Sequence, residues 1–379
     1  MEVKAGYKQT EVGVIPKDWE IKLLPDICRF RGGKAHEQHI SDFGRFVCVN
    51  SKFISTNGCV RKYSTVNFCC AKRNDVLMVM SDLPNGKALA KAFLADQDNL
   101  YAVNQRVCAL TPYRDCPKYL FYVLNRNPYF LGFDDGVNQT HLLNPVFQKC
   151  LLSLPPTKAE QEAIAEALSD ANALIESLDQ LLAKKRHIKQ GAMQELLTGK
   201  KRLPGFSGEW EVKRLGEILT VCHGKSQSDV EATDGQYPIL ASGGEIGRAN
   251  RFLYDKPSVL IGRKGTIDQP QYMDTPFWTV DTLFYSVVHE PNHAKFMFYR
   301  FCLIDWKQHN EASGVPSLNA RTIEKIEISS PAPDEQSAIA AILSDMDVSI
   351  GALEAKLSKT RQLKQGMMQE LLTGRIRLV

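Results

Sequence analysis

The sequence lacks the long apolar runs of a membrane protein. No stretch approaches the roughly 18 apolar residues that a spanning helix needs. The first residues, Met1 to Lys8, contain no apolar core of the kind found in signal peptides. With 44% apolar and 24% charged residues, the composition predicts a soluble globular protein with no membrane partner, and the N-terminal residues indicate the cytoplasm. Its ten cysteines should then be reduced rather than paired in disulfides.

Zinc-type cysteine spacing is also missing. Eight of the ten cysteines lie between Cys28 and Cys150, and no two of them form a C-x-x-C pair. Such pairs are the usual signature of a structural zinc site. We therefore predict that the chain holds no metal.

Catalytic signatures are incomplete wherever part of one occurs. His223-Gly224-Lys225-Ser226 ends like a phosphate-binding loop, but Leu219 stands where the earlier glycine is required. Asn127-Pro128-Tyr129-Phe130 lacks the second proline of the Asn-Pro-Pro-aromatic signature of amino-methyltransferases, and no Gly-rich cofactor loop accompanies it. A turn that ends a helix is the simpler interpretation. Paired carboxylates, a nucleophile elbow and an H-E-x-x-H pattern are absent too. We predict no catalytic residues.

The strongest positive feature is an internal duplication. Residues 161–203 align with residues 336–378 without a gap, at a constant offset of 175, and 24 of the 43 positions are identical. A weaker echo at an offset of 191 joins Trp19-Glu20 to Trp210-Glu211 and Gly33-Lys34 to Gly224-Lys225. Each half therefore begins and ends alike, while the sequences between differ in length and in residues.

The long repeat has the pattern of a helix with one apolar seam. Apolar residues alternate four and three apart in the same phase in both copies, as in a coiled coil. The seam positions are Ile164, Leu168, Ile175, Leu178 and Leu182 in the first copy and Ile339, Leu343, Ile350, Leu353 and Leu357 in the second, and Ala171 and Met346 complete the alternation.

Start and stop signals bound both helices. Thr157 to Glu160 forms a capping box before the first, Asp334 and Glu335 open the second, and Gly199 and Gly374 close them. About 40 residues of helix span on the order of 60 Å. We expect the two copies to pack on each other, but the periodicity leaves open whether they run parallel or antiparallel.

The two bodies between these common parts are predicted to be mixed strand and short helix. The apolar runs 76–80 and 258–262 have strand length, and each leads into a polar loop that carries glycine and a basic residue. Such loops can approach a phosphate or a base edge, although any surface turn can have the same composition. A net charge of +4 and a pI near 8.4 permit a nucleic-acid partner without indicating one.

The arrangement of body, seam helix, body and seam helix resembles a type I restriction-modification specificity subunit over nearly the whole chain. The most specific motifs are Gly6-Tyr7-Lys8-Gln9-Thr10-Glu11-Val12-Gly13-Val14-Ile15-Pro16 before Trp19, Glu-Gln at residues 160–161 and 335–336, Lys-Gln-Gly at residues 189–191 and 364–366, and Gln-Glu-Leu-Leu-Thr-Gly at the end of both helices.

This resemblance implies an α+β fold: two mixed α/β target recognition domains separated by two long antiparallel coiled-coil helices, with pseudo-two-fold symmetry. The implied boundaries are residues 1–155 and 200–330 for the recognition domains and residues 156–199 and 331–379 for the helices. Unequal bodies predict an asymmetric bipartite target in double-stranded DNA. The resemblance further implies two methyltransferase subunits and restriction subunits as partners, with S-adenosylmethionine, ATP and Mg²⁺ bound in those partners and no cofactor in this chain.

Candidate contacts with bases or phosphates follow from the basic and hydroxyl residues of the loops. They are Arg31, Lys34, Lys52, Lys87, Ser242, Arg248, Arg263, Lys264 and Thr266. Two other classes compete with this interpretation. A self-contained DNA methyltransferase would need the missing motifs, and a coiled-coil adaptor would not need two different bodies.

Overall fold

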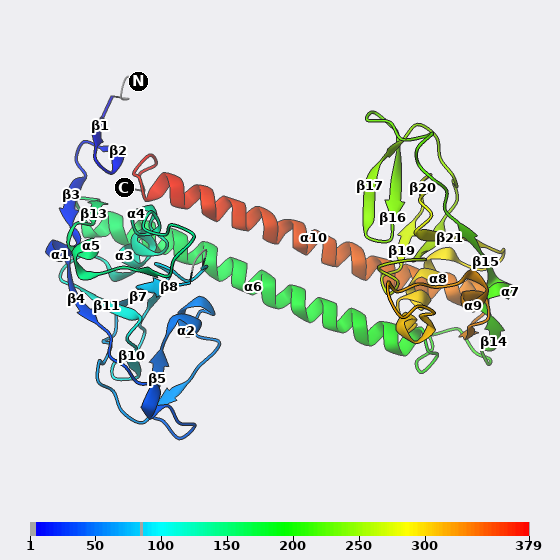
Figure 1. Cartoon of the computed structure of the whole chain (residues 1–379), viewed down its shortest axis with the longest axis horizontal. Helices are drawn as coiled ribbons and strands as arrows, with labels where there is room; N and C mark the ends of the chain where they lie inside the picture. The colour runs from blue at the N-terminus through cyan, green and yellow to red at the C-terminus, as the bar shows by residue number, and fades with distance from the viewer. Residues whose placement is uncertain (1–4, 84–85, 379) are drawn as a thin grey trace. The chain divides into compact units, whose positions relative to one another are not determined.

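The chain forms two compact units. The structure is a computed structural model that describes residues 5–83 and 86–378. Unit 1 comprises Met1–Ser177 and Leu357–Val379, and unit 2 comprises Leu178–Lys356. The long helices α6 (Lys158–Leu196) and α10 (Pro333–Leu371) each contribute to both units (Figure 1).

Unit 1 contains a four-stranded antiparallel sheet in the order β4-β11-β7-β9, a three-stranded sheet in the order β10-β5-β6, and three strand pairs, β1-β2, β13-β3 and β12-β8. The strands are β1 (Tyr7–Thr10), β2 (Gly13–Pro16), β3 (Glu20–Leu23), β4 (Cys28–Gly32), β5 (Phe46–Val49), β6 (Tyr63–Ser64), β7 (Val76–Val79), β8 (Ser81–Asp82), β9 (Ala92–Leu94), β10 (Tyr101–Val103), β11 (Val107–Pro112), β12 (Thr140–His141) and β13 (Leu151–Leu154). The short helices are α1 (Leu24–Ile27), η1 (Glu37–His39), α2 (Ser51–Ser55), α3 (Pro117–Leu124), α4 (Pro128–Leu131) and α5 (Asn144–Gln148).

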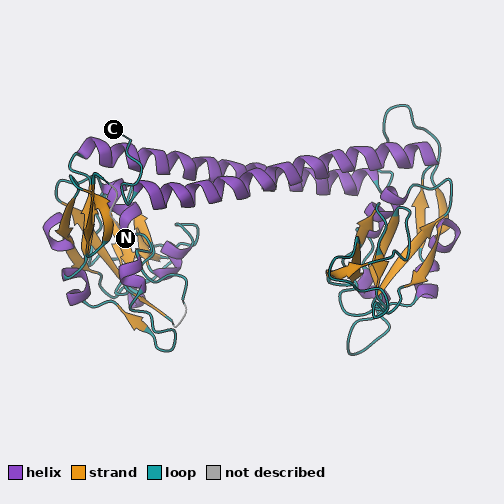
Figure 2. Cartoon of the chain, turned by 90° about the horizontal axis from the view of Figure 1, so that it is seen from above, coloured by secondary structure: helices purple, strands orange, loops and turns teal. Residues whose placement is uncertain are grey.

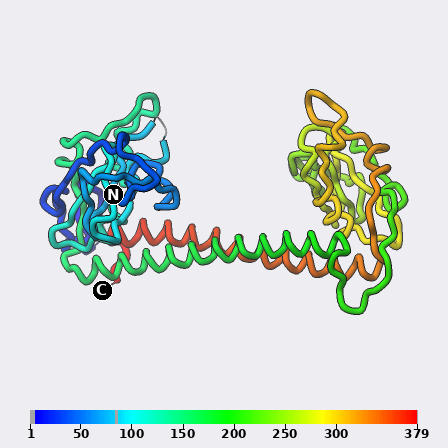
Figure 3. The backbone as a smooth tube through the Cα atoms, turned by 90° about the horizontal axis from the view of Figure 1, so that it is seen from below, coloured from blue at the N-terminus to red at the C-terminus, as the bar shows by residue number. Residues whose placement is uncertain are grey.

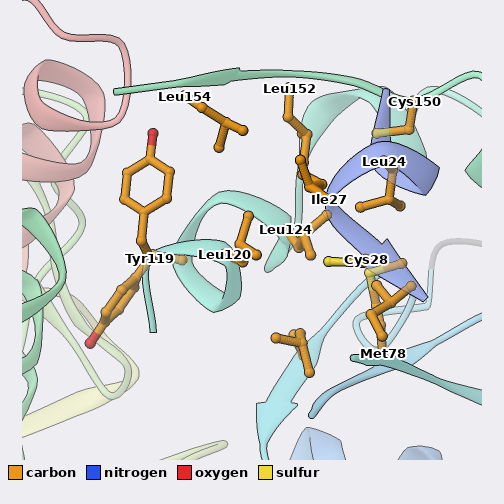
Figure 4. Close-up of a cluster of buried hydrophobic side chains, with 14 of the residues drawn as sticks. Leu24, Ile27, Cys28, Met78, Tyr119, Leu120, Leu124, Cys150, Leu152 and Leu154 are labelled. Atoms are coloured by element: carbon orange, nitrogen blue, oxygen red, sulfur yellow. The ribbon is translucent and has the colours of Figure 1, made fainter. Parts of the chain in front are cut away.

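The main core of unit 1 joins the four-stranded sheet to α3 and to both long helices. Met78 of β7, Leu120 of α3 and Leu152 of β13 lie in one buried cluster (Figure 4). Leu168 near the start of α6 and Leu371 at the end of α10 belong to the same cluster. The repeated helix ends are therefore part of the body's core, and the body should not fold without them.

Unit 2 contains a four-stranded sheet in the order β15-β21-β18-β19, a three-stranded sheet in the order β17-β16-β20, and the pair β14-β22. Its strands are β14 (Glu211–Arg214), β15 (Leu219–His223), β16 (Tyr237–Ala241), β17 (Gly244–Ala249), β18 (Ser258–Gly262), β19 (Gln271–Met273), β20 (Trp278–Thr279), β21 (Leu283–Val288) and β22 (Glu327–Ser330). The short helices are α7 (Leu215–Ile218), α8 (Ala294–Phe301), η2 (Trp306–His309) and α9 (Ala320–Glu324). Figure 2 shows short helices in purple beside the orange strands in both bodies.

The two bodies share a fold that their sequences conceal. In unit 1 strand β11 pairs with β4 and β7, and in unit 2 strand β21 pairs with β15 and β18 in the same antiparallel sense. The three-stranded sheets each combine one parallel and one antiparallel pairing. The interiors that differ in sequence are thus two versions of one α/β architecture.

Equivalent side chains anchor that architecture to the long helices. The hydroxyl of Tyr122 contacts Ser169 at 3.2 Å and accepts from Asn172 at 2.8 Å. In unit 2 the hydroxyl of Tyr299 contacts Ser344 at 3.3 Å and donates to Asp347 at 2.7 Å. Ser344 and Asp347 stand 175 residues after Ser169 and Asn172. The repeat therefore preserves two kinds of helix position: the apolar seam residues and the polar residues that hydrogen-bond to the body.

The start and stop signals lie near the ends of α6 (Lys158–Leu196) and α10 (Pro333–Leu371). The N–H of Glu160 donates to the Thr157 hydroxyl at 3.2 Å, which is one of the two hydrogen bonds of a capping box. Gly199 and Gly374 follow the helix ends with φ of +72° and +69°, the left-handed conformation in which glycine is favoured. All ten predicted seam residues are buried or half-buried.

The Glu of the Glu-Gln motif has a function that the capping box did not predict. In unit 2 the buried carboxylate of Glu335 accepts two hydrogen bonds of 2.7 Å from Arg202, beside Trp210. In unit 1 Glu160 is paired in the same way with Arg377, whose guanidinium also donates to Asp18. The end of each repeat is thereby fixed to the start of a helix in its own unit. In unit 1 this brings the C-terminal segment to the β1-β2 hairpin, where the Tyr7 hydroxyl donates to the Gly374 carbonyl at 3.1 Å. Figure 3 shows the red C-terminal end of α10 and the blue N-terminal segment in the same body.

Two ion pairs link the long helices within unit 2. Lys189 pairs with Asp347, and Arg186 pairs with Glu354 at 2.5 Å. The later residue of α6 is paired with the earlier residue of α10. The two segments therefore run in opposite directions in this unit, the alternative that periodicity alone left undecided.

His293 makes the stability of unit 2 depend on pH. It caps α8, accepting from the N–H of Phe296, and burial lowers its pKa below the ordinary value of 6.5. The unfolded chain binds this proton first as the pH falls, so the contribution is complete above pH 6.5 and is lost as the pH drops toward the folded-state pKa. We expect His293→Asn, which retains a capping oxygen, to lose less stability between pH 7.5 and pH 5.5 than the wild type. Hydrogen exchange of the α8 amides would measure this difference, and equal pH dependence in both proteins would contradict it.

Candidate nucleic-acid interface

Unit 1 has a cavity of about 280 Å³ beside its three-stranded sheet, where β5 and β10 end and β6 begins. Three exposed cations lie around it, and a carboxylate lies among them. The lining residues are Glu37, Ile40, Cys48, Asn50, Ser51, Lys52, Lys62, Asn104 and Arg106. We call this set the unit 1 pocket. Of the residues predicted to contact DNA, Lys52 lines it.

Local turns bring these residues together. Asn50 follows β5 and caps α2, its side chain accepting from the N–H of Phe53 at 2.9 Å, and this places Lys52 on the first turn. After β10, the N–H of Val107 donates to the main-chain carbonyl of Asn104 at 2.9 Å, and this bond closes a tight turn that carries Arg106. Gly33 lies against that turn, where a Cβ would be 2.1 Å from the Asn104 carbonyl, so only glycine fits.

A hydrogen-bonded network fixes the carboxylate of the pocket. The side-chain oxygen of Asn104, itself buried, accepts from the N–H of His36 at 3.1 Å, and its amide donates to Glu37 Oε1 at 2.9 Å. The His36 ring is buried and accepts from the N–H of Phe68 at Nε2. This places the ring proton on Nδ1, 2.7 Å from the Lys34 carbonyl. The Asn104 bond is the main cause that lowers the pKa of Glu37.

The other predicted residues of unit 1 lie elsewhere. Lys34 is exposed and forms a β-bridge to Asn104, next to the pocket. Arg31 points inward and forms an ion pair with the buried Asp75, with a second bond of 2.8 Å to the Cys70 carbonyl. Lys87 is exposed on the loop after β8, and this loop includes residues 84–85, which lie outside the described residues.

In unit 2 the structure gathers four predicted residues around one loop. Arg263, Lys264 and Thr266 follow β18, and the Ser242 hydroxyl would lie 3.3 Å from a Cβ on Gly265. The loop is held on both sides, since the N–H of Arg263 donates to Thr282 at 2.8 Å and the N–H of Leu318 donates to Arg263 at 2.9 Å.

Arg248 lies outside this group. It is on β17 and is paired with Glu245 at 3.2 Å. Arg263 and Lys264 thus form the principal cationic loop of unit 2 among the predicted residues.

The two loops chosen from the sequence occupy equivalent places. In unit 1 the N–H of Met80 donates to Arg106 and its carbonyl accepts from Leu142, just as Arg263 bonds with Thr282 and Leu318 in unit 2. Lys62, Arg106 and Glu37 were missed, because Lys62 and Arg106 lie in loops, Glu37 begins the short helix η1, and none of the three belongs to a motif. Lys225 was also missed, although the Gly-Lys echo pairs it with Lys34 and the N–H groups of both donate to equivalent carbonyls.

Two further findings concern the described residues, 5–83 and 86–378. They contain no group of three or more His, Cys, Asp or Glu residues arranged to hold a metal ion. None of their helices is long and apolar enough to cross a membrane.

Burial raises the pKa of the Cys28 and Cys150 thiols to about 12, so both stay protonated and are poor nucleophiles at neutral pH.

Comparisons with known proteins agree with this architecture. Residues 16–184 and 207–361 each match the family described as the type I restriction modification DNA specificity domain. A putative type I restriction enzyme MjaX specificity subunit from Methanocaldococcus jannaschii is 24% identical, over 98% of this chain and 97% of its own length.

Two solved structures are similar in fold. The S subunit of a type I restriction-modification system from M. genitalium superposes with a TM-score of 0.70 at 15% identity, covering 98% of both chains. A chain from a study of assembly and conformational transition of the type I R-M system gives a TM-score of 0.54 at 15% identity, covering 96% of this chain and 99% of the other. The family's role is DNA specificity, a recognition function and not a catalytic one. Since the two matches together cover most of the sequence, the chain belongs to the family of type I restriction-modification specificity subunits.

Proposed function

We propose that this chain recognises an asymmetric bipartite target in double-stranded DNA and directs adenine methylation and restriction by partner subunits. The observation that carries the proposal is the presence of two bodies with one strand order and different side chains at equivalent loop positions. Equal folds suit two half-sites on one duplex. Different loops, with Met80 and Ser81 in unit 1 where unit 2 has Arg263 and Lys264, suit half-sites of different sequence.

In this proposal the long helices form an antiparallel coiled coil that separates the recognition domains. Half-sites on one face of DNA lie about one turn apart, roughly 34 Å, and helices of on the order of 60 Å can span that distance. The opposed ion pairs Lys189–Asp347 and Arg186–Glu354 support the antiparallel direction.

The proposed partners are two methyltransferase subunits and restriction subunits. The helix ends repeat the same sequence, so each copy can present the same surface to one copy of the same partner. S-adenosylmethionine, ATP and Mg²⁺ would be bound in those partners, and the assembly would act on double-stranded DNA in the cytoplasm. The fold shared with the second solved structure, which comes from work on complex assembly of a type I R-M system, supports such an assembly.

A genome-wide map of methylated adenines tests the proposal. Cells that express this chain with its neighbouring methyltransferase should show a bipartite motif, and cells that lack this chain should not. Copurification of the methyltransferase shows whether the complex assembles. Identical maps in the two strains, with the complex assembled, would refute the proposed function.

Arg263→Ala should relax specificity in one half-site only. Arg263 lies in the loop after β18 of unit 2, and unit 1 has Met80 at the equivalent place. Loss of a bidentate base contact costs on the order of 1–3 kcal/mol of discrimination. The same methylation map measures the result, with Arg321→Ala, on the exposed side of α9, as a control of equal charge change. An unchanged motif in Arg263→Ala would remove this residue from the interface.

A further inference from the structure

The unit 1 pocket combines unpaired cations with one fixed carboxylate. Within residues 5–83 and 86–378, Lys52, Lys62 and Arg106 form no ion pair, and all three are exposed. Glu37 lines the same cavity. The four formal charges sum to +2, which favours an anionic partner, yet the carboxylate lies among the cations without neutralising any of them through a direct contact.

Glu37 is held in place by buried groups. Its Oε1 accepts from Asn104 at 2.9 Å and from Gln105 at 3.3 Å. Asn104 is in turn bonded to the main chain of His36 at 3.1 Å. Because the Asn104 bond lowers the pKa of Glu37, the side chain is ionised at neutral pH and serves only as an acceptor.

A pocket for phosphate alone does not account for this carboxylate. Phosphate sites present donors and positive charge, and an ionised Glu37 would repel a phosphate placed beside it. An acceptor of this kind suits an amino group. In the major groove the exposed amino groups are cytosine N4 and adenine N6, and Glu characteristically accepts from cytosine N4, while adenine is usually bound by Asn or Gln through N6 and N7 together.

We propose that Glu37 accepts a hydrogen bond from the N4 amino group of a cytosine in the half-site read by unit 1, while Lys52, Lys62 and Arg106 hold the neighbouring phosphates. This inference rests on the proposed function and adds a base identity to one half-site. It assigns specificity to the carboxylate and affinity to the cations, because phosphate contacts position a protein on DNA and base contacts specify the sequence.

Unit 2 has no such acceptor at the equivalent position. Gly33 and Gly224 lie against equivalent turns, with Asn104 in one and Val280 in the other. Counting on from these glycines, Glu37 corresponds to Ser228, whose hydroxyl contacts Ser226 at 3.0 Å. The side chain of Val280 has no hydrogen-bond donor, so unit 2 lacks the equivalent of the Asn104 amide that orients Glu37 in unit 1. The two half-sites should therefore differ at this position.

The test uses the assembled complex of this full chain with its methyltransferase partner, in cells and in vitro. The wild type, Glu37→Gln and Glu37→Ala are compared by adenine methylation mapping. Glu20→Gln, an exposed carboxylate on β3 outside the pocket, is the matched control. We expect Glu37→Ala to reduce discrimination at one G·C position of one half-site by about tenfold. Glu37→Gln should admit A·T there, because Gln can bind adenine N6 and N7. Glu20→Gln should leave the motif unchanged.

The outcomes separate this inference from the proposed function. If the wild-type motif is bipartite but both Glu37 variants retain it in full, the inference is wrong and the proposed function stands. Equal weakening of both half-sites, or a wild-type half-site without a G·C pair at the affected position, would likewise assign Glu37 a structural role and overturn the inference. If deletion of the whole chain leaves the map unchanged, the proposed function itself fails. Thermal melting and copurification with the methyltransferase show that each variant is folded and assembled.

Discussion

Asp75→Ala should reduce the free energy of unfolding of unit 1 by about 3–5 kcal/mol, the usual cost of breaking a buried ion pair from one side. The Asp75 side chain is fully buried and forms an ion pair with Arg31. It also accepts from the Lys72 N–H at 2.8 Å and from the Thr111 hydroxyl at 2.6 Å. Removal of the carboxylate leaves all three donors without this acceptor, in a sheet where water cannot readily replace it. Urea unfolding followed by hydrogen exchange of the β7 and β11 amides would measure the loss.

The control is Asp98→Ala, because Asp98 is exposed and accepts only the N–H of Arg73 at 2.9 Å among the described residues. This change should cost less than about 1 kcal/mol. A double-mutant cycle with Arg31→Ala isolates the pair, and its interaction energy should exceed about 1 kcal/mol because the residues are in direct contact. A loss for Asp75→Ala no larger than that for Asp98→Ala would contradict the prediction.

This result also bears on Arg31, which the loop chemistry placed among the candidate DNA contacts. Its guanidinium is already bonded to Asp75 and to the Cys70 carbonyl. We therefore expect Arg31→Ala to lower the stability of unit 1 more than it changes the methylated motif. Sequence alone did not distinguish this arginine from Lys34, three residues later, because the difference lies in a partner 44 residues away in the chain.

The long helices were predictable because their signals are local. Seam spacing, the Thr157 cap and the glycines after each helix depend on residues within a few positions of one another. The duplication made the assignment stronger, since both copies had to obey the same pattern. Even here a non-local contact was missed: Glu160 and Glu335 are paired with arginines 217 and 133 residues away.

The shared fold of the two bodies was hidden because different residues satisfy the same buried positions. Asp75 precedes β7 in unit 1, and its carboxylate accepts from the Thr111 hydroxyl of β11. At the equivalent place in unit 2, Ser258 begins β18, and its hydroxyl donates to the Ser286 carbonyl of β21 at 2.7 Å. Strand order depends on pairings between distant segments, and a polar network can be replaced by another of different chemistry without changing those pairings. Sequence identity is lost while topology is kept.

The candidate site was predicted in part for the same reason. The loops chosen after the two apolar runs occupy equivalent places in the two units, and Lys52 lines the unit 1 pocket. Lys62 and Arg106 come from other turns and approach Lys52 only through the parallel pairing of β10 with β5 and the antiparallel pairing of β6 with β5. No spacing rule in the sequence joins residues 52, 62 and 106.

Replacing Lys52, Lys62 and Arg106 together by alanine should weaken binding of the assembled complex to a duplex that carries its methylated motif by on the order of a hundredfold at 0.1 M salt. Each phosphate contact contributes about −0.9 to the slope of log affinity against log salt, so loss of three should make the slope about 2.7 less steep.

The triple variant of Arg114, Lys118 and Lys149 removes the same charge from exposed positions of unit 1 outside the pocket. The salt slope of this control variant should stay near that of the wild type. The slope reports the counterions that direct phosphate contacts release, whereas the control residues would affect binding only through the net charge. Equal slopes for the two triple variants would show that the pocket cations act only through net charge. If the triple variant of Lys52, Lys62 and Arg106 changes the methylated motif but leaves the salt slope unchanged, these three residues contact bases and not phosphates.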